Sequence, residues 1–137
     1  MNTWVLVFAV ALVAGFVAVF LFNAMPSGGQ GAELVLNRRR LNSIHSFVYT
    51  IFNKGTKPIS LGEAYDIQYR TDGEWVSVAW LKEVVWPAVL YTVQPGESFS
   101  REVQIPEDAP SGSYRLVKKI YIDDVERVLT AEFEVAG

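Results

Sequence analysis

The opening of the chain is uncharged and almost entirely apolar, and this limits the fold more than any other feature. Residues 2–32 contain no Lys, Arg, Asp or Glu, and residues 4–22 are nearly all Val, Ala, Leu and Phe. A helix over this run would be about 28 Å long, close to the ~30 Å hydrocarbon layer of a bilayer. Because such a helix would offer water no polar face, it does not fit a soluble fold.

We therefore predict a single N-terminal transmembrane α-helix in residues 1–25, a flexible linker in residues 26–32 and one folded domain in residues 33–137. A cleavable signal peptide usually starts with a charge and has small residues at the cut. Here the start is uncharged, and Phe22 occupies the third position before a cut after Ala24. These features favour an uncleaved signal anchor.

The lipid bilayer is thus the first partner that the sequence predicts. Within a bilayer, small side chains let helices approach each other closely and pack. Three small residues are candidates for packing against the helices of a larger membrane assembly: Ala11, Gly15 and Ala18.

The charged residues all belong to the part after residue 32. The chain of 137 residues has 12 basic and 15 acidic side chains, a formal net charge of -3 and a pI near 5.1. Nucleic-acid binding needs a basic face, so we do not expect it. The chain has no cysteine, which excludes a disulfide framework and a thiolate metal site.

The sequence offers little for catalysis or metal binding. His45 is the one histidine, which rules out a histidine zinc cluster, and no GxSxG or other nucleophile signature accompanies it. Asp123, Asp124 and Glu126 lack the glycine spacing of a calcium loop and fit a solvated turn. We expect no enzyme activity, no cofactor and no bound metal.

Beyond residue 32 the apolar residues alternate with polar ones, which is typical of strands with one face in water. The alternation is clear in SFVYTIFN, AYDIQYR, SFSREVQI and SYRLVKKIYI, and again in residues 129–135. Short strands at intervals of about ten residues predict an all-β, two-sheet antiparallel sandwich.

The turns between these strands have recognisable sequences. Asn53-Lys54-Gly55 and Asp72-Gly73 predict residues with positive φ, and Gln94-Pro95-Gly96 predicts a type II turn.

Three stretches carry a resemblance to a known family: LNSIHSFVYTIFNKGTKPISLGEAYDIQYRTDGEWVSV, WPAVLYTVQPGESFSREVQI and PSGSYRLVKKI. They resemble the bacterial Ig-like domains of many secreted proteins and lipoproteins, over residues 33–135. The resemblance rests on an Asn-ended strand before a Gly turn, a Gly-x-Trp hairpin, a Pro-Gly-Glu turn and a Gly-x-Tyr-Arg strand entry. It implies an antiparallel Ig-like β-sandwich of about 7–8 strands, and it is nearly silent on function.

The side of the membrane on which the domain lies follows from the resemblance more than from charge. Arg38, Arg39 and Arg40 would place the domain in the cytoplasm by the positive-inside rule. These arginines lie some fifteen residues beyond the apolar run, and we expect them in a folded hairpin, so they are a weak topological signal. Relatives of this kind imply a single-pass membrane protein whose C-terminal domain is extracytoplasmic; many have a lipobox cysteine, in whose place a helix anchor would serve.

Three residues are candidates for a structural role. Gly112 followed by Tyr114 at the start of a strand resembles a tyrosine corner, in which the phenol bonds back to nearby backbone. Trp75 belongs to the Gly-x-Trp hairpin of the resemblance.

The stretch WVSVAWLKEVVWPAVLY breaks the alternation and holds three of the four tryptophans. Large aromatic residues in an irregular loop are typical of protein-binding hot spots, but they also close the open end of a sandwich. Both interpretations stay open from sequence. The candidate partner contacts are Trp80, Val85, Trp86 and Pro87.

The leading functional hypothesis is a non-enzymatic, membrane-anchored Ig-like module that binds or supports a protein partner at the outer membrane face, for example as an accessory subunit of a membrane complex. The alternative is a filament subunit similar to archaeal pilins, in which the N-terminal helix forms the core of the fibre. The charged leader of such precursors is missing here.

Overall fold

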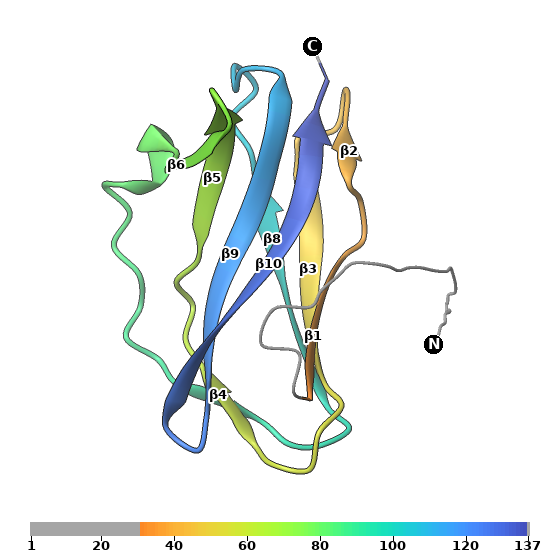
Figure 1. Ribbon diagram of the computed structural model, residues 1–137, viewed down its shortest axis with the longest axis vertical. Coiled ribbons are helices and arrows are strands. Elements are labelled where there is room, and N and C mark those ends of the chain that lie inside the picture. Colours follow the sequence, from red (N-terminus) through yellow and green to blue (C-terminus); the bar gives the residue numbers. More distant parts are fainter. Residues whose placement is uncertain (1–30, 137) are drawn as a thin grey trace.

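The computed structural model describes residues 31–136 as an all-β sandwich of two sheets packed face to face (Figure 1). The first sheet has the order β1-β3-β8, with β1 at Ala32–Leu36, β3 at Ser46–Asn53 and β8 at Ser98–Gln104. The second sheet has the order β2-β10-β9-β4-β7, with β5 paired to the first half of β9 and β6 paired to β5. The strands of the second sheet are β2 (Arg40–Leu41), β4 (Ile59–Leu61), β5 (Asp66–Thr71), β6 (Glu74–Ser77), β7 (Tyr91–Val93), β9 (Gly112–Ile122) and β10 (Val125–Val135).

The predicted antiparallel Ig-like sandwich is confirmed, with two differences. The described residues form ten strands rather than seven or eight, because β2, β4 and β7 contain only two or three residues each. The pairing of β2 with β10 is parallel, since the chain passes from β1 in one sheet to β2 in the other without reversing direction. Arg38 and Arg39 lie in this crossing and not in a hairpin.

The described residues hold one short 3-10 helix, η1 (Ala79–Leu81), and no helix long and apolar enough to cross a bilayer. The predicted transmembrane helix, residues 1–25, lies outside the described residues. The same is true of its proposed packing residues Ala11, Gly15 and Ala18. β1 starts at Ala32, one residue before the predicted start of the domain.

The core lies between the sheets and is made by the inward phase of each long strand. On β3 the buried apolar residues are Phe47, Tyr49 and Ile51, as the alternation predicts. The ring of Phe47 lies 4.8 Å from that of Phe133 on β10, so the two sheets interlock through aromatic side chains. Paired aromatic rings add to the stabilisation that their burial gives.

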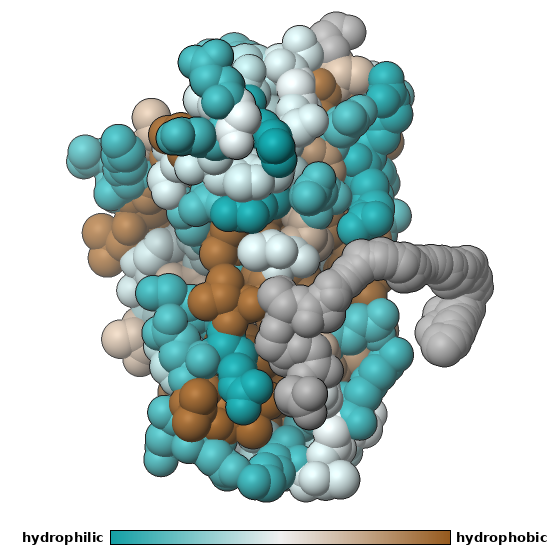
Figure 2. Space-filling model, in the orientation of Figure 1, coloured by the Kyte–Doolittle hydropathy of each residue, from teal (hydrophilic) through white to brown (hydrophobic). Residues whose placement is uncertain are grey.

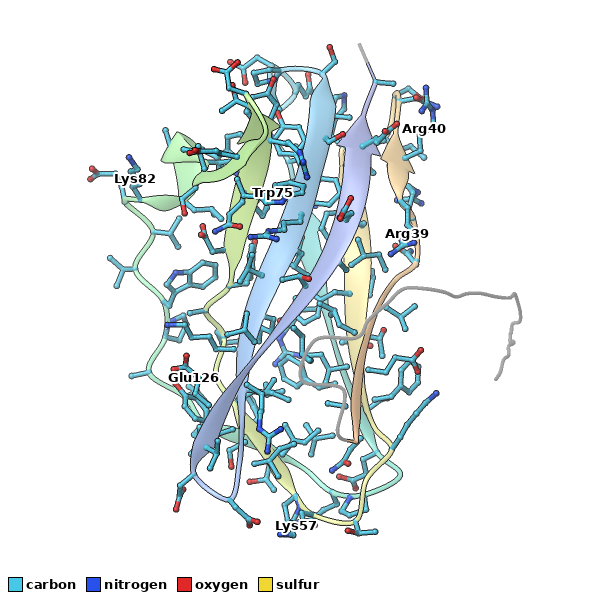
Figure 3. The ribbon with its side chains drawn as sticks, viewed as in Figure 1. Arg39, Arg40, Lys57, Trp75, Lys82 and Glu126 are labelled. Carbon is cyan, nitrogen blue, oxygen red and sulfur yellow. The ribbon has the colours of Figure 1, made fainter. Side chains whose placement is uncertain are left out.

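The sandwich has two ends, separated by the length of β9, eleven residues or about 33 Å. At the end where the described chain begins, the Lys54 N–H donates to the carbonyl of Gly31 (2.6 Å). Lys57 lies at this end, and Arg39 and Arg40 lie toward the opposite one (Figure 3). We call them the tether end and the far end.

Gly31 and Gly55 at the tether end lack side chains, which lets their two backbone segments approach each other closely. A Cβ on Gly55 would lie 3.1 Å from the Gly31 Cα, so the two backbones touch. The prediction of positive φ in the Asn53-Lys54-Gly55 turn is wrong, because within residues 31–136 none of these three residues has it. Positive φ is found where predicted at Asp72 (52°) and Gly73 (79°), and also at Gly96 (86°) in the Gln94-Pro95-Gly96 turn.

Tyr114 begins the buried face of β9 and bonds back to the chain just before it. Its hydroxyl donates a hydrogen bond to the carbonyl of Pro110 (2.5 Å), and its ring stacks 5.5 Å from that of Phe133. Burial raises the pKa of this phenol to about 12. Gly112, at φ 147°, lies against the ring of Tyr69: a Cβ there would lie 3.0 Å from a ring carbon, and the backbone conformation itself disfavours any other residue. The hydrogen bond from Tyr114 to Pro110 ties the 106–110 loop to the core.

We expect Tyr114→Phe to lower the free energy of unfolding by about 1–2 kcal/mol, because it removes one buried hydrogen bond and leaves the Pro110 carbonyl without that donor. Tyr121→Phe is the matched control: Tyr121 lies on the outer face of the same strand, 37% exposed. The control should change stability by less than about 0.5 kcal/mol. Guanidinium unfolding followed by tryptophan fluorescence measures both. Equal effects of the two changes would show that the Pro110 contact adds nothing.

Candidate docking site

An exposed apolar segment, residues 84–90, follows η1 and precedes β7 without belonging to any strand. Its side chains face water: Val85 is 92% exposed, Leu90 70%, Val89 45% and Val84 41%. The segment runs along one side of the sandwich toward the tether end (Figure 1). On that side, at the left edge of the molecule, Figure 2 shows brown, hydrophobic surface. Contiguous exposed apolar surface on a folded domain commonly marks an interaction site. We call these residues the apolar segment.

The structure separates the four predicted partner contacts. Trp80, on η1, packs against the core with its ring 6.2 Å from that of Tyr114, and its buried Nε1 has no hydrogen-bond partner within residues 31–136. Val85 and Pro87 are exposed. Trp86 is half-buried. Trp80 therefore packs into the sandwich, whereas Val85 and Pro87 form surface.

Trp75, the predicted structural tryptophan, lies on the outer face of the second sheet (Figure 3). The guanidinium carbons of Arg115 and Arg70 lie 4.6 Å and 5.3 Å from the centre of its ring. These cation–π contacts join Trp75 on β6 to Arg70 on the neighbouring strand β5 and to Arg115 on β9, the strand beyond β5, across the outer face of the sheet.

The apolar segment and its continuation into β7 rest on the connection between β4 and β5, residues 62–65, which we call the bridge. The ring of Trp86 meets that of Tyr65 edge to face, 4.7 Å between centroids. The Tyr91 hydroxyl donates to the Glu63 carboxylate (2.6 Å). A Cβ on Gly62 would lie 3.4 Å from the carbonyl oxygen of Val89. The segment is thus held at Trp86, at Val89 and just beyond its end at Tyr91, although it belongs to no sheet.

Lys118 holds the bridge from inside the core. It lies on the inward face of β9 and is 0% exposed, and its Nζ donates to the carbonyl oxygens of Gly62 and, at 2.7 Å, Ala64. Burial lowers the pKa of this amine to about 8, an effect that the nearby Glu63 carboxylate opposes. A buried charge is tolerated only when hydrogen-bonded, and here the bridge supplies the acceptors.

Arg101, on β8, closes the seam between the two sheets. Its guanidinium donates to the Glu63 carboxylate through Nε (3.1 Å) and Nη2 (2.9 Å), a two-point contact of the strong kind. Hydrogen bonds from Arg101 and Tyr91 lower the pKa of Glu63, and the same carboxylate raises the pKa of Arg101. We call Lys118, Glu63, Arg101 and Tyr91 the brace.

The brace is suited to holding structure, because its members are committed to each other and to the bridge. Next to it, the buried hydroxyl of Tyr49 has no hydrogen-bond partner in the described part of the chain, and burial raises its pKa. His45 lies elsewhere, just before β3, where its carbonyl accepts a hydrogen bond from the Ile105 N–H (2.8 Å).

The acidic turn considered for calcium is the β9–β10 hairpin. Asp123 and Asp124 have φ of 53° and 61°, which suits a tight hairpin turn, and Asp123 pairs with Lys57. Across residues 31–136, no group of three or more His, Cys, Asp or Glu side chains is arranged to hold a metal ion.

Sequence reasoning missed the brace. It singled out the stretch that contains the apolar segment and named Val85, Trp86 and Pro87, but it did not name Val89 or Leu90 as contacts. One signal for Lys118 was present: it falls in the same phase as Tyr114, Leu116 and Ile120, so alternation places it in the core. Val89 and Leu90 belong to the same apolar stretch as Val85. Their exposure depends on what the fold leaves uncovered, which the local pattern does not report.

Together the two sheets and the tyrosine corner define an Ig-like β-sandwich. The sequence pattern of the bacterial Ig-like domain family matches residues 28–134. The chain therefore belongs to the bacterial Ig-like domain family.

Solved structures resemble the chain only distantly. They include the alkylpurine DNA glycosylase AlkC of Pseudomonas fluorescens bound to DNA containing an abasic site analog (15% identity, 78% of this chain and 31% of that one, TM-score 0.41). A β-glucosidase of Listeria innocua in complex with glucose has 17% identity over 77% of this chain and 16% of that one (TM-score 0.38). The PmoD soluble domain of Methylocystis sp. has 11% identity over 77% and 90% (TM-score 0.40).

The chain thus spans about a third of the length of AlkC and about a sixth of the β-glucosidase. No curated protein matches the sequence significantly.

Proposed function

We propose that this chain is a non-enzymatic, membrane-anchored Ig-like module that binds a protein partner at the outer face of the membrane, as an accessory subunit of a membrane complex. The observation that carries the proposal is the apolar segment, with Val85 at 92% and Leu90 at 70% exposure on a backbone fixed by the bridge. Membership of the Ig-like family fits a module for protein interaction.

A fixed apolar loop is a better binding surface than a mobile one. Ordering a loop on binding costs free energy, and here Trp86 on Tyr65 and Tyr91 on Glu63 have already ordered it. Exposed aliphatic side chains beside a half-buried tryptophan resemble the anchors of protein interfaces. The anchor part of the proposal rests on the charge-free residues 2–32.

We expect the double change Val85→Asp with Leu90→Asp to reduce partner capture at least tenfold, because two carboxylates would be desolvated at the contact. The assay is a pull-down of the full chain in mild detergent, followed by mass spectrometry. Val76→Asp is the matched control, since Val76 is also an exposed valine (48%) but lies on β6. Circular dichroism checks that each variant is folded. Undiminished capture by the double variant would contradict docking through this segment.

The same preparations test the membrane anchor and the filament alternative. Retention of the chain in membranes washed with alkaline carbonate, and cleavage of the domain by protease added to intact cells, are the results expected of an extracytoplasmic anchored module. Full-length chain that is soluble without detergent would contradict the anchor. Helical fibres in electron micrographs would favour the pilin-like subunit instead.

A further inference from the structure

The apolar segment ends near the point where the chain enters the sandwich. The Asn53 side chain donates to the carbonyl of Val93 (2.8 Å), and the next residue, Lys54, bonds to Gly31. Leu90 is three residues from Val93, about 10 Å along the chain. Leu90 therefore lies toward the tether end. The apolar segment that leads to it runs along the side of the sandwich (Figure 1), and Val85 comes five residues earlier in the chain.

The tether sets how far this end can move from a membrane. Between the predicted helix in residues 1–25 and Gly31 there are five residues, which reach about 17 Å even when fully extended. With the helix in a bilayer, the tether end and Leu90 stay close to the lipid surface. A partner that covers Leu90 has to fit into this narrow space.

The size of the surface also limits the kind of partner. The apolar segment has seven residues, whereas stable interfaces between freely diffusing proteins use roughly 20–30 residues a side. So small a contact gives low affinity in solution. Confinement of both partners to one bilayer raises their effective concentration, and then a small contact suffices.

Lipid itself is a poor occupant, because acidic and basic side chains are mixed near the tether end and, within residues 31–136, form no basic cluster there. Lys54 and Lys57 are paired with Glu33 and Asp123. Further carboxylates at this end belong to Glu97, Asp124 and Glu126, and they are interspersed with the cations of Lys119 and Arg127 on the same hairpin. Anionic headgroups attract clusters of basic residues and repel acidic ones.

From these observations, and resting on the proposed function, we propose that the occupant of the apolar segment is a different integral membrane protein in the same bilayer. That protein presents an apolar surface just outside the lipid, against Val85, Val89 and Leu90. The tether end of the sandwich faces the membrane, and the apolar segment on its side contacts the neighbouring membrane protein.

Photo-crosslinking of the full chain in its native membranes tests this. Benzoylphenylalanine replaces Leu90, Val85 or, as the control, Ile44, which is 50% exposed near the far end. We expect positions 90 and 85 to give adducts with one and the same protein, which stays in carbonate-washed membranes, and position 44 to give little of it. Twenty Gly and Ser residues inserted between Gly28 and Gly29 should lower the adduct yield about tenfold, because effective concentration falls as roughly the −3/2 power of tether length.

Each other outcome counts against the proposal. Adducts with a soluble protein, with lipid alone, or with a second copy at twice 15.3 kDa would overturn the membrane-embedded partner. Soluble adducts would still leave docking through the apolar segment intact. No adduct at positions 85 and 90, from a chain that is folded and membrane-bound, would overturn both the partner and the proposed function. An unchanged yield with the lengthened tether would remove confinement as the reason for binding.

Discussion

Asn53→Ala is expected to lower the free energy of unfolding by about 3 kcal/mol. The side chain is 2% exposed and joins three segments at the tether end. Its Nδ2 donates to the carbonyls of Lys57 and Val93 (both 2.8 Å), and its Oδ1 accepts from the Gly55 N–H (3.0 Å). Each lost bond costs about 1 kcal/mol, and a buried carbonyl left without its donor costs more.

Asn37→Ala is the matched control for this change. The Asn37 side chain also accepts a hydrogen bond from backbone, the Val48 N–H at 2.8 Å, but in an exposed position. Water can replace it there, so we expect a loss below about 1 kcal/mol. Guanidinium unfolding of the full chain in mild detergent compares the two variants. Similar losses would mean that Asn53 does not hold the end of β3 to β7.

The second large effect is on pH dependence. The Lys118 amine has a pKa of about 8 in the folded protein against an ordinary value of 10.5. Between these pH values the unfolded chain binds more protons than the folded one, so the free energy of unfolding rises with pH. The rise over this window is about 3 kcal/mol, at 1.36 kcal/mol per unit.

Above pH 10 the sign reverses. Burial raises the pKa of Tyr114 to about 12 and also raises that of Tyr65, so these phenols ionise first in the unfolded chain and stability falls. We therefore expect maximal stability near pH 10.

Lys118→Met keeps the length of the side chain and removes its titration. Unfolding curves of both proteins from pH 7 to 10 measure the difference: the wild type should gain stability over this range, and the variant should not. Parallel curves would show that the Lys118 amine titrates normally and that its burial does not perturb it.

Much of the fold could be predicted because strand alternation is a local property. The pattern in SFVYTIFN coincides with β3, and buried Phe47, Tyr49 and Ile51 follow its phase. Strands of two or three residues, such as β2 and β7, give no period that a sequence pattern could reveal. They exist because a longer neighbour pairs with them, which is a property of the assembled sheets.

The candidate site was harder to predict because its contacts are distant in sequence. Lys118 donates to a carbonyl 56 residues away, and Arg101 meets Glu63 across 38 residues. Trp80 and Trp86 have similar neighbours in the sequence. Trp80 nevertheless packs against Tyr114 in the core, whereas Trp86 packs against Tyr65 at the edge of the sandwich. Only the tertiary arrangement of the bridge distinguishes them.

The guanidinium of Arg101 also alters the free edge of β8. Residue 53 is hydrogen-bonded to residue 97, and residue 45 to residue 105, across β3 and β8. Hydrogen-bonded and non-hydrogen-bonded pairs alternate along an antiparallel ladder, so the pair Thr50 and Ser100 is of the second kind and the Ser100 carbonyl points away from β3. Arg101 Nη1 donates to that oxygen (2.8 Å). A strand from a neighbouring molecule that approached this edge would find one acceptor already taken and a cation in its path. Copies of the domain are thereby hindered from aggregating edge to edge into a continuous sheet.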